Sequence, residues 1–158
     1  MRLCQFLRLS GLAYAADPPA SNGLVGRWTN GRLSTIQYQD AYTGVARPPA
    51  GNHFAYEFRP DGTYVFTGLI QNTLYNCTTV MFGEESGTYE LDAAGTEVSL
   101  HPKKNPFRMT NSCAPSTNSE ASGKLTDRGY RFVISGTQFA LTATSDRAVQ
   151  NFHRQQPR

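Results

Sequence analysis

The chain has 158 residues, enough for one domain of ordinary size with its own hydrophobic core. Aromatic residues make up 11% and charged residues only 17%, beside 14 Gly and 9 Pro, and this composition favours a β-protein with many turns over a helical bundle. The formal net charge is +3 with both signs interspersed, which excludes the basic footprint of a nucleic-acid-binding protein. No stretch has the length and apolar character of a transmembrane helix.

The N-terminus shows the pattern of an export signal. Arg2 supplies a positive start, residues 3–12 form a short apolar run, and Ala13-Tyr14-Ala15 fits an A-x-A cleavage pattern. Arg8 interrupts the apolar run, so an ordinary N-terminal tail of a cytoplasmic protein stays open as the alternative. We expect residues 1–16 to be a signal peptide and the mature protein to be periplasmic or secreted.

Residues 17–23 are predicted to be a linker, because their two prolines and one glycine suit neither a helix nor a sheet. A single domain is expected over residues 24–158. Its first strands are expected at residues 24–28 and 35–39. The following segment, residues 40–52, contains two prolines and two glycines and is predicted to be a long loop.

The clearest element is a β-hairpin over residues 54–68. Aromatic residues alternate with other residues on both sides of Arg59-Pro60-Asp61-Gly62, which has the composition of a tight turn. Further strands are predicted at residues 74–82, 86–91, 97–101, 107–110, 123–126, 130–135 and 139–143. Short strands at this spacing indicate an all-β fold, and we expect an antiparallel meander barrel of about 8 to 10 strands.

The cysteine pattern predicts one disulfide. If Cys4 is removed with the signal, Cys77 and Cys113 remain as an even pair, and the sequence contains no C-x-x-C motif. Two unrelated buried thiols are the alternative. Cys113 lies in a second predicted loop, residues 111–122, which is rich in Ser, Thr and Asn.

The C-terminal segment is expected to form a short helix. Ser145-Asp146 is a good N-cap, and Val149 and Phe152 are three residues apart, as on one face of a helix. Such a helix over residues 145–156 would pack on the barrel.

Three motifs resemble those of small exported bacterial domains of the lipocalin-like (calycin) type. They are Gly26-Arg27-Trp28, the segment Phe58 to Tyr64 with its Asp-Gly turn, and Gly87-Thr88-Tyr89, and the similarity covers roughly residues 24–143. The resemblance implies a barrel whose first-strand tryptophan closes one end. It also implies a basic residue packed on that tryptophan, for which Arg147 is the candidate. It does not imply a particular ligand, because fold alone does not determine function.

The aromatic residues of the hairpin are predicted to share the inner face of the barrel, because side chains alternate along a strand. They are expected to form the core, or alternatively to line a pocket for a small hydrophobic ligand. The ligand-binding candidates are Trp28, Phe54, Tyr56, Phe58, Tyr64, Phe66 and Tyr89.

Few residues suggest catalysis or metal binding. The three histidines, His53, His101 and His153, are far apart in sequence and lack metal-ligand spacing, so no metal and no cofactor are predicted. His53 with Glu57 is the best candidate for a general base, although a solvent-facing pair is the more ordinary interpretation. Glu84 and Glu85 are expected in a solvated turn.

Three functions therefore remain open. The first is an exported, monomeric lipocalin-like protein that binds a small apolar or amphipathic ligand at the loop-bearing mouth of its barrel. The second is an inhibitor or interaction protein with a solid core that contacts a protein partner through loops 40–52 and 111–122. The third is a small barrel enzyme, which would require His53 to lie in a cleft with a carboxylate.

Overall fold

The computed structural model describes residues 23–33, 38–39, 46–47 and 51–155. The predicted signal peptide, nearly all of the linker and most of loop 40–52 lie outside these residues. The described chain forms the following strands and one 3-10 turn: β1 (Gly26–Leu33), β2 (Tyr38–Gln39), β3 (Ala46–Arg47), β4 (Gly51–Phe58), β5 (Thr63–Leu74), β6 (Cys77–Leu91), β7 (Glu97–Lys104), β8 (Pro106–Asn111), η1 (Pro115–Thr117), β9 (Ser119–Ser122), β10 (Arg128–Ser135), β11 (Gln138–Ala143) and β12 (Val149–Arg154).

The main sheet closes into an antiparallel barrel of eight strands. The ring runs β1-β4-β5-β6-β7-β10-β11-β12, and β12 pairs with β1 to complete it. Strands next to each other in this ring also follow each other along the chain, apart from the short β2–β3 and β8–β9 insertions. The predicted all-β meander barrel is confirmed, and its architecture is consistent with a calycin-like fold.

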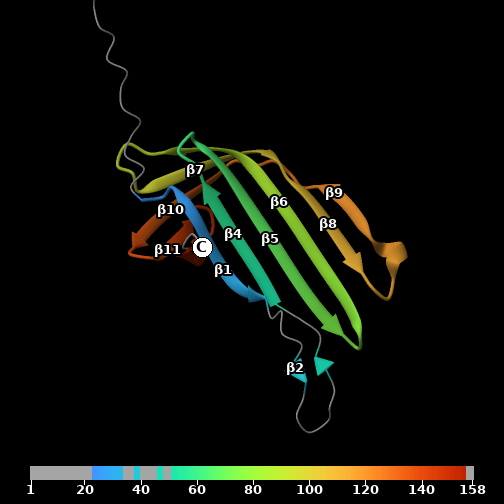
Figure 1. Cartoon of the computed structure of the whole chain (residues 1–158). Helices are drawn as coiled ribbons and strands as arrows, with labels where there is room; N and C mark the ends of the chain where they lie inside the picture. The colour runs from blue at the N-terminus through green and yellow to red at the C-terminus, as the bar shows by residue number, and fades with distance from the viewer. Residues whose placement is uncertain (1–22, 34–37, 40–45, 48–50, 156–158) are drawn as a thin grey trace, which may run out of the picture.

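Four strands continue past one end of the barrel as a sheet that we call the arm. It consists of residues 67–74 of β5, residues 77–84 of β6, and all of β8 and β9 (Figure 1). β7 and β8 are separated by Asn105 alone, and both pair with β6, so β6 belongs to the barrel along one half and to the arm along the other. We call the end of the barrel from which the arm extends its open end, because inner-face residues of the arm such as Ile70 and Met81 are exposed.

The other end of the barrel is closed around Trp28. This side chain is fully buried, and its indole nitrogen donates a hydrogen bond to the carbonyl oxygen of Leu24 at 2.8 Å. The Arg154 guanidinium lies over the indole ring at 4.1 Å and also donates to the carbonyl oxygen of Val25. The expected tryptophan closure is present, but the expectation that Arg147 supplies the cation is wrong, because Arg147 is exposed in the turn before β12.

The predicted turn at residues 59–62 is confirmed. Gly62 has a φ of +80°, and the Asp61 carboxylate accepts hydrogen bonds from the backbone and hydroxyl of Thr63. These bonds to the charged form lower the pKa of Asp61. Tyr89 of β6 connects this turn to its strand. Its backbone N–H donates a hydrogen bond to the carbonyl oxygen of Gly62, and its hydroxyl donates to the carbonyl oxygen of Arg59.

The C-terminal segment is a strand, so the expected helix is wrong. Phe152 points into the core and pairs with Phe139 of β11, while Thr29 of β1 pairs with His153. Without β12, the edges of β1 and β11 would have no partner, and pairing both edges outweighs the weak helical signal of the segment.

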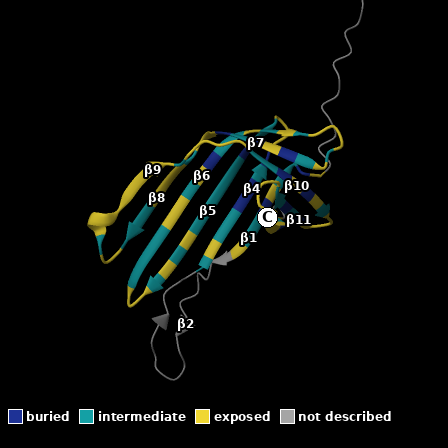
Figure 2. Cartoon of the chain, turned by 180° about the vertical axis from the view of Figure 1, so that it is seen from behind, coloured by how far each residue is buried: buried dark blue, intermediate teal, exposed yellow. Residues whose placement is uncertain are grey.

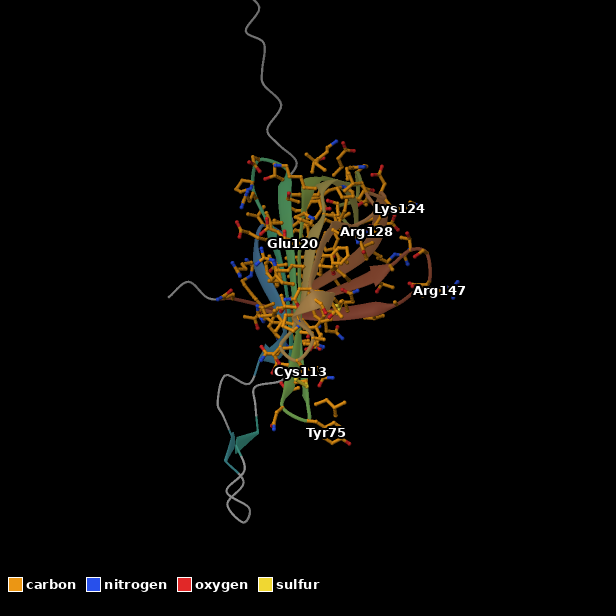
Figure 3. All side chains as sticks on the ribbon, turned by 90° about the vertical axis from the view of Figure 1, so that its right-hand side faces the viewer. Tyr75, Cys113, Glu120, Lys124, Arg128 and Arg147 are labelled. Atoms are coloured by element: carbon orange, nitrogen blue, oxygen red, sulfur yellow. A yellow bond between two sulfur atoms is a disulfide. The ribbon has the colours of Figure 1, made fainter. Side chains whose placement is uncertain are left out.

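Further boundaries differ from prediction, since β5 extends to Leu74 beyond the expected hairpin end at residue 68, and β4 begins at Gly51 inside the predicted loop 40–52. Residues 77–91 form one continuous strand instead of two, and residues 123–127 form a connection, whereas the preceding residues 119–122 form β9 inside the predicted loop 111–122. The disulfide between Cys77 and Cys113 is confirmed, and it joins the start of β6 to this same segment at the tip of the arm, where Cys113 lies near Tyr75 (Figure 3).

Candidate ligand-binding site at the open end of the barrel

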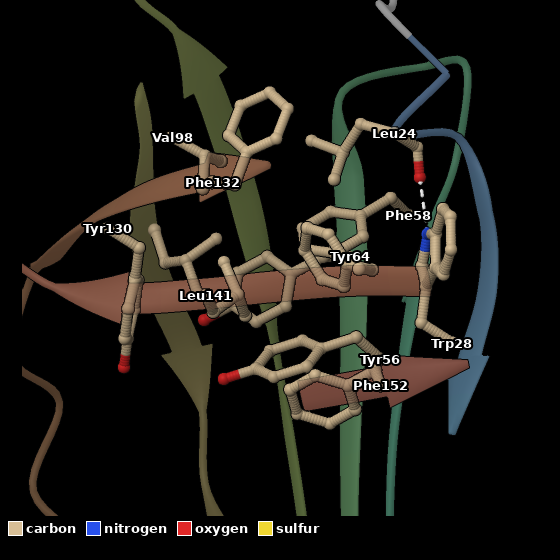
Figure 4. Packing of buried hydrophobic residues seen from close by; sticks show 12 residues of the cluster. Leu24, Trp28, Tyr56, Phe58, Tyr64, Val98, Tyr130, Phe132, Leu141 and Phe152 are labelled. Atoms are coloured by element: carbon tan, nitrogen blue, oxygen red, sulfur yellow. Dashed lines mark hydrogen bonds between the residues drawn. The ribbon is translucent and has the colours of Figure 1, made fainter. Parts of the chain in front are cut away.

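The half of the barrel next to Trp28 is filled by aromatic side chains (Figure 4). Phe139 contacts the rings of Trp28 and Phe58, with centroids 4.9 and 6.1 Å apart, and Tyr56 packs edge-on against Phe152. Such offset and edge-to-face packing is the preferred arrangement of aromatic rings. This half of the barrel is a packed aromatic core.

Toward the arm, the inner face becomes polar around Glu85. This carboxylate is buried in β6, with 5% of its side chain exposed, and it accepts a hydrogen bond from the Tyr64 hydroxyl at 2.7 Å. The Arg128 guanidinium, at the start of β10, forms an ion pair with the same carboxylate oxygen. Arg128 is 38% exposed, so the pair extends from the core to solvent at the open end.

Two more tyrosines complete this polar cluster, which comprises Glu85, Arg128, Tyr56, Tyr64 and Tyr130. The hydroxyl ends of the three tyrosines point to the same side of the core (Figure 4). Burial raises the pKa of Tyr56 well above its usual range, with further contributions from Tyr130 and Glu85, and burial also raises that of Tyr64. These phenols stay protonated at neutral pH and can donate hydrogen bonds.

Some donors of the cluster have no acceptor. The Arg128 Nε atom is buried without a hydrogen-bond partner. Within the described ranges, the hydroxyls of Tyr56 and Tyr130 also make no hydrogen bond. Because a buried donor without a partner costs stability, the Arg128 Nε atom favours an occupant that brings an acceptor atom.

The inner face continues from the cluster onto the arm, where it is apolar and accessible. Ile70 and Met81 are paired across β5 and β6 and are 43% and 44% exposed, and Phe107 on β8 is 38% exposed. The arm carries intermediate and exposed residues, whereas buried residues gather in the barrel (Figure 2). A strip of accessible apolar surface therefore leads from solvent to the polar cluster.

Two facing glycines leave a shallow place in this strip. Gly68 and Gly83 are paired across β5 and β6, next to Phe66 and Glu85. The Phe54 ring covers Gly68, whereas a side chain at Gly83 would have only ordinary contacts, the nearest with Phe107. The surface beside Gly83 can therefore accept additional atoms.

All seven predicted ligand-binding residues lie on or against the inner face. Trp28, Tyr56, Phe58 and Tyr64 are buried, while Phe54, Phe66 and Tyr89 are partly buried and pack against the core. Of the seven, Phe54 and Phe66 lie closest to the arm on the inner face of the β4–β5 hairpin. Phe54 pairs with Gly68, and Phe66 pairs with Tyr56 in the next inner-face pair along the hairpin. The binding of a ligand by these residues stays a prediction.

The His53 general-base hypothesis is wrong. His53 lies on the outer face of β4, opposite in direction to Phe54 and Tyr56, and Glu57 pairs with Arg59 and Arg27 instead. His101 contacts Asp127 at 2.9 Å at the surface. Among the described residues, no group of three or more His, Cys, Asp or Glu side chains is placed to hold a metal ion.

The polar cluster was missed by sequence reasoning. Glu85 was expected in a solvated turn, and Arg128 was assigned to a tight connection. The alternation of Tyr89 and Leu91, extended back along the strand, places residue 85 on the inner face, and this signal could have found the buried carboxylate. Glu84, its neighbour, is exposed as expected.

No protein-family model matches this sequence, and no curated protein matches it significantly. Within the described ranges, the structure contains no helix with the length and apolar character that crossing a membrane requires.

Proposed function

We propose that this protein is an exported lipocalin-like carrier that binds a small amphipathic molecule at the open end of its barrel. The observation that carries the proposal is the inner face itself, which passes from a packed core through a polar cluster to an accessible apolar strip. Binding sites for small molecules commonly combine apolar walls with a few polar groups that orient the ligand.

The apolar part of the ligand would lie along Phe54, Gly83 and Phe107. Exposed apolar surface of this kind gains about 25 cal/mol for each Å² removed from water. The polar group of the ligand would face Arg128, Tyr56 and Tyr130. Because these residues offer unpaired donors, the preferred polar group is a hydrogen-bond acceptor such as a carbonyl or carboxylate oxygen.

Export is supported by the disulfide, because disulfides persist in oxidising compartments and are rare in the cytosol. The expected signal pattern at residues 1–16 agrees with this. A single copy supplies every residue of the proposed site, in keeping with the expected monomer.

A second candidate, a protein-interaction module, is favoured by the composition of the arm. Residues 63–83 contain no Asp, Glu, Lys or Arg. Leu74 and Tyr75, at the tip of the β5–β6 hairpin, are 64% and 90% exposed. An uncharged, partly apolar projection also suits contact with a protein, with the 111–122 segment beside it.

The test compares ligand binding by the wild type and by two leucine variants of β6. Gly83→Leu fills the shallow place on the inner face, and Thr88→Leu adds the same side chain on the exposed outer face as a control. We expect the neutral apolar probe N-phenylnaphthylamine to gain fluorescence with the wild type and Thr88→Leu. Gly83→Leu should bind it at least about fivefold more weakly, as expected for losing roughly 1 kcal/mol of contact.

Competition then tests the polar group. Methyl dodecanoate should displace the probe better than dodecylamine, and Arg128→Met should remove the difference. Native mass spectrometry of the protein from its own exported fraction would show a co-purified ligand directly. Absence of probe binding together with a ligand-free mass would reject the carrier and favour the interaction module.

A further inference from the structure

A hollow on the arm is lined mainly by residues that point away from the proposed ligand site, although Phe107 belongs to both. It has a volume of about 530 Å³ and is lined by residues 82, 84, 106–108 and 120–122. Phe82, Arg108 and Glu120 are directly paired across β6, β8 and β9, so their side chains share one face. That face is the outer one, because Glu85 and Gly83 alternate with Phe82 and Glu84 and point inward.

The hollow carries a net negative charge. Arg108 and Glu120 neutralise each other through an ion pair of 2.7 Å. The exposed Glu84 carboxylate has no ion-pair partner among the described residues. Lys104, which pairs with Ser86 one step along the strand, does not line the hollow. One uncompensated carboxylate therefore faces an open space.

Phe82 provides an aromatic surface next to this carboxylate. The side chain is 43% exposed, and no cation from the described part of the chain lies over its ring. A ring face attracts a cation, most strongly when little water intervenes. Phe82 and Glu84 are two residues apart on the same strand face, so one cationic group can contact both.

The charges decide between classes of occupant. An anion would be repelled by Glu84, and a neutral apolar group would cover that carboxylate without offering it a compensating charge. A metal ion is also disfavoured, because Glu120 is engaged by Arg108 and the described residues hold no third acidic or histidine ligand nearby. An organic cation satisfies both the ring and the carboxylate.

We propose that the hollow lined by Phe82, Glu84 and the Arg108–Glu120 pair is a binding site for an alkylammonium group. This group would be held by cation–π attraction to Phe82 and by charge attraction to Glu84. Phe82 and Glu84 point away from the inner face, so the proposal does not depend on the proposed carrier function, although Phe107 lines both sites.

The test is a chemical-shift titration of the full isotope-labelled chain with tetramethylammonium chloride. A neutral molecule of similar size, tert-butyl methyl ether, serves as the comparison ligand, and sodium chloride keeps the ionic strength constant. We expect saturable shifts of the Phe82 ring protons and of the amides of residues 82–84 and 106–108 with the cation. The neutral ligand should bind at least about threefold more weakly, the change typical of losing one exposed charge interaction.

Matched variants locate the effect. Glu84→Gln should weaken cation binding about threefold or more, and Phe82→Leu should do so by a similar factor. Glu90→Gln, at an exposed outer-face position of the same strand outside the hollow, should leave binding unchanged. A lysine-containing peptide and free butylammonium, tested in parallel, distinguish a protein side chain from a small molecule as the source of the cation.

Equal binding of the cation and the neutral ligand would overturn the proposal, and so would unchanged affinity in Glu84→Gln. Phenylnaphthylamine binding at the inner face should be the same in all three variants. Failure of the carrier proposal is thereby measured separately from failure of the cation site.

Discussion

At the scale of single residues, Glu85 determines the character of the open end. It is the buried charged residue of the described chain, and its carboxylate is shared by Tyr64 and Arg128. A buried charge needs both a counter-ion and hydrogen bonds to be tolerated. Here Glu85 receives both, while Arg128 keeps an unpaired Nε atom.

Replacing Glu85 by glutamine should destabilise the protein. The substitution keeps the size of the side chain but leaves Arg128 without its counter-ion. Because water reaches part of Arg128, we expect a loss of about 1 to 3 kcal/mol in the free energy of unfolding, less than for a fully buried pair. Urea denaturation measures it. Glu84→Gln is the control, with an expected change below about 0.5 kcal/mol, and an equally small change for Glu85→Gln would contradict the assigned role.

At the scale of elements, the local signals in the sequence identified the hairpins well. The alternation of residues 54–58 and 64–68 and the Asp61-Gly62 turn are reproduced in β4, β5 and their connection. The C-terminal strand could not be recognised in this way, because spacing of Val149 and Phe152 suits a helix. What makes this segment a strand is its pairing with β1, which lies more than a hundred residues earlier in the chain.

The arm depends on its disulfide. Cys77 and Cys113 are 36 residues apart in sequence and close a loop that contains β6, β7 and β8 and the turn between β6 and β7. On the chain-entropy model, closing a loop of this length stabilises the protein by about 3 to 4 kcal/mol. Cross-linking the arm tip therefore also restrains the barrel strands that continue into it.

The double variant Cys77→Ser/Cys113→Ser should lose about 3 to 4 kcal/mol of stability for this reason. Urea denaturation of wild type, variant, and wild type with reductant measures the loss. Reductant should lower the stability of the wild type to that of the variant and leave the variant unchanged. If reductant does not affect the wild type, the bridge has no role in stability.

At the scale of the whole molecule, burial of phenols should make the fold sensitive to high pH. Burial raises the pKa of Tyr56 and Tyr64 above the usual value near 10, whereas these groups titrate normally in the unfolded chain. Their contribution to stability is therefore complete below about pH 10. It falls as the pH rises further, because ionisation then favours the unfolded chain.

Thermal unfolding followed by circular dichroism between pH 8 and pH 11.5 tests this expectation. The wild type should lose stability above about pH 10, and Tyr56→Phe should lose less between the same two pH values. Tyr75→Phe removes the hydroxyl of a residue that is 90% exposed and should follow the wild type. A Tyr56→Phe profile parallel to that of the wild type would show that this phenol does not contribute.

The sequence alone predicted the barrel but not where it opens. Strand alternation and turn residues are local, and they led to the correct class of fold. The open end arises because β6 changes partners from β7 to β8 between Ser86 and Gly83, and residues 123–127 interrupt the continuation of β9 into β10. Both events depend on pairing between distant segments, which a single sequence does not display.

The closure of β12 on β1 gives the barrel a cyclic order. Arg154 donates a hydrogen bond to the Val25 carbonyl, and the backbone N–H of Gln155 donates to Arg27, so the two ends of the described domain lie side by side. A chain rejoined there by a short linker, and cut instead at the tight turn around Gly136, would retain every strand pair of the ring. Pairing thus fixes which strands are neighbours in the barrel, but it does not fix which strand comes first in the chain. Circular permutation would therefore preserve the topology of the barrel.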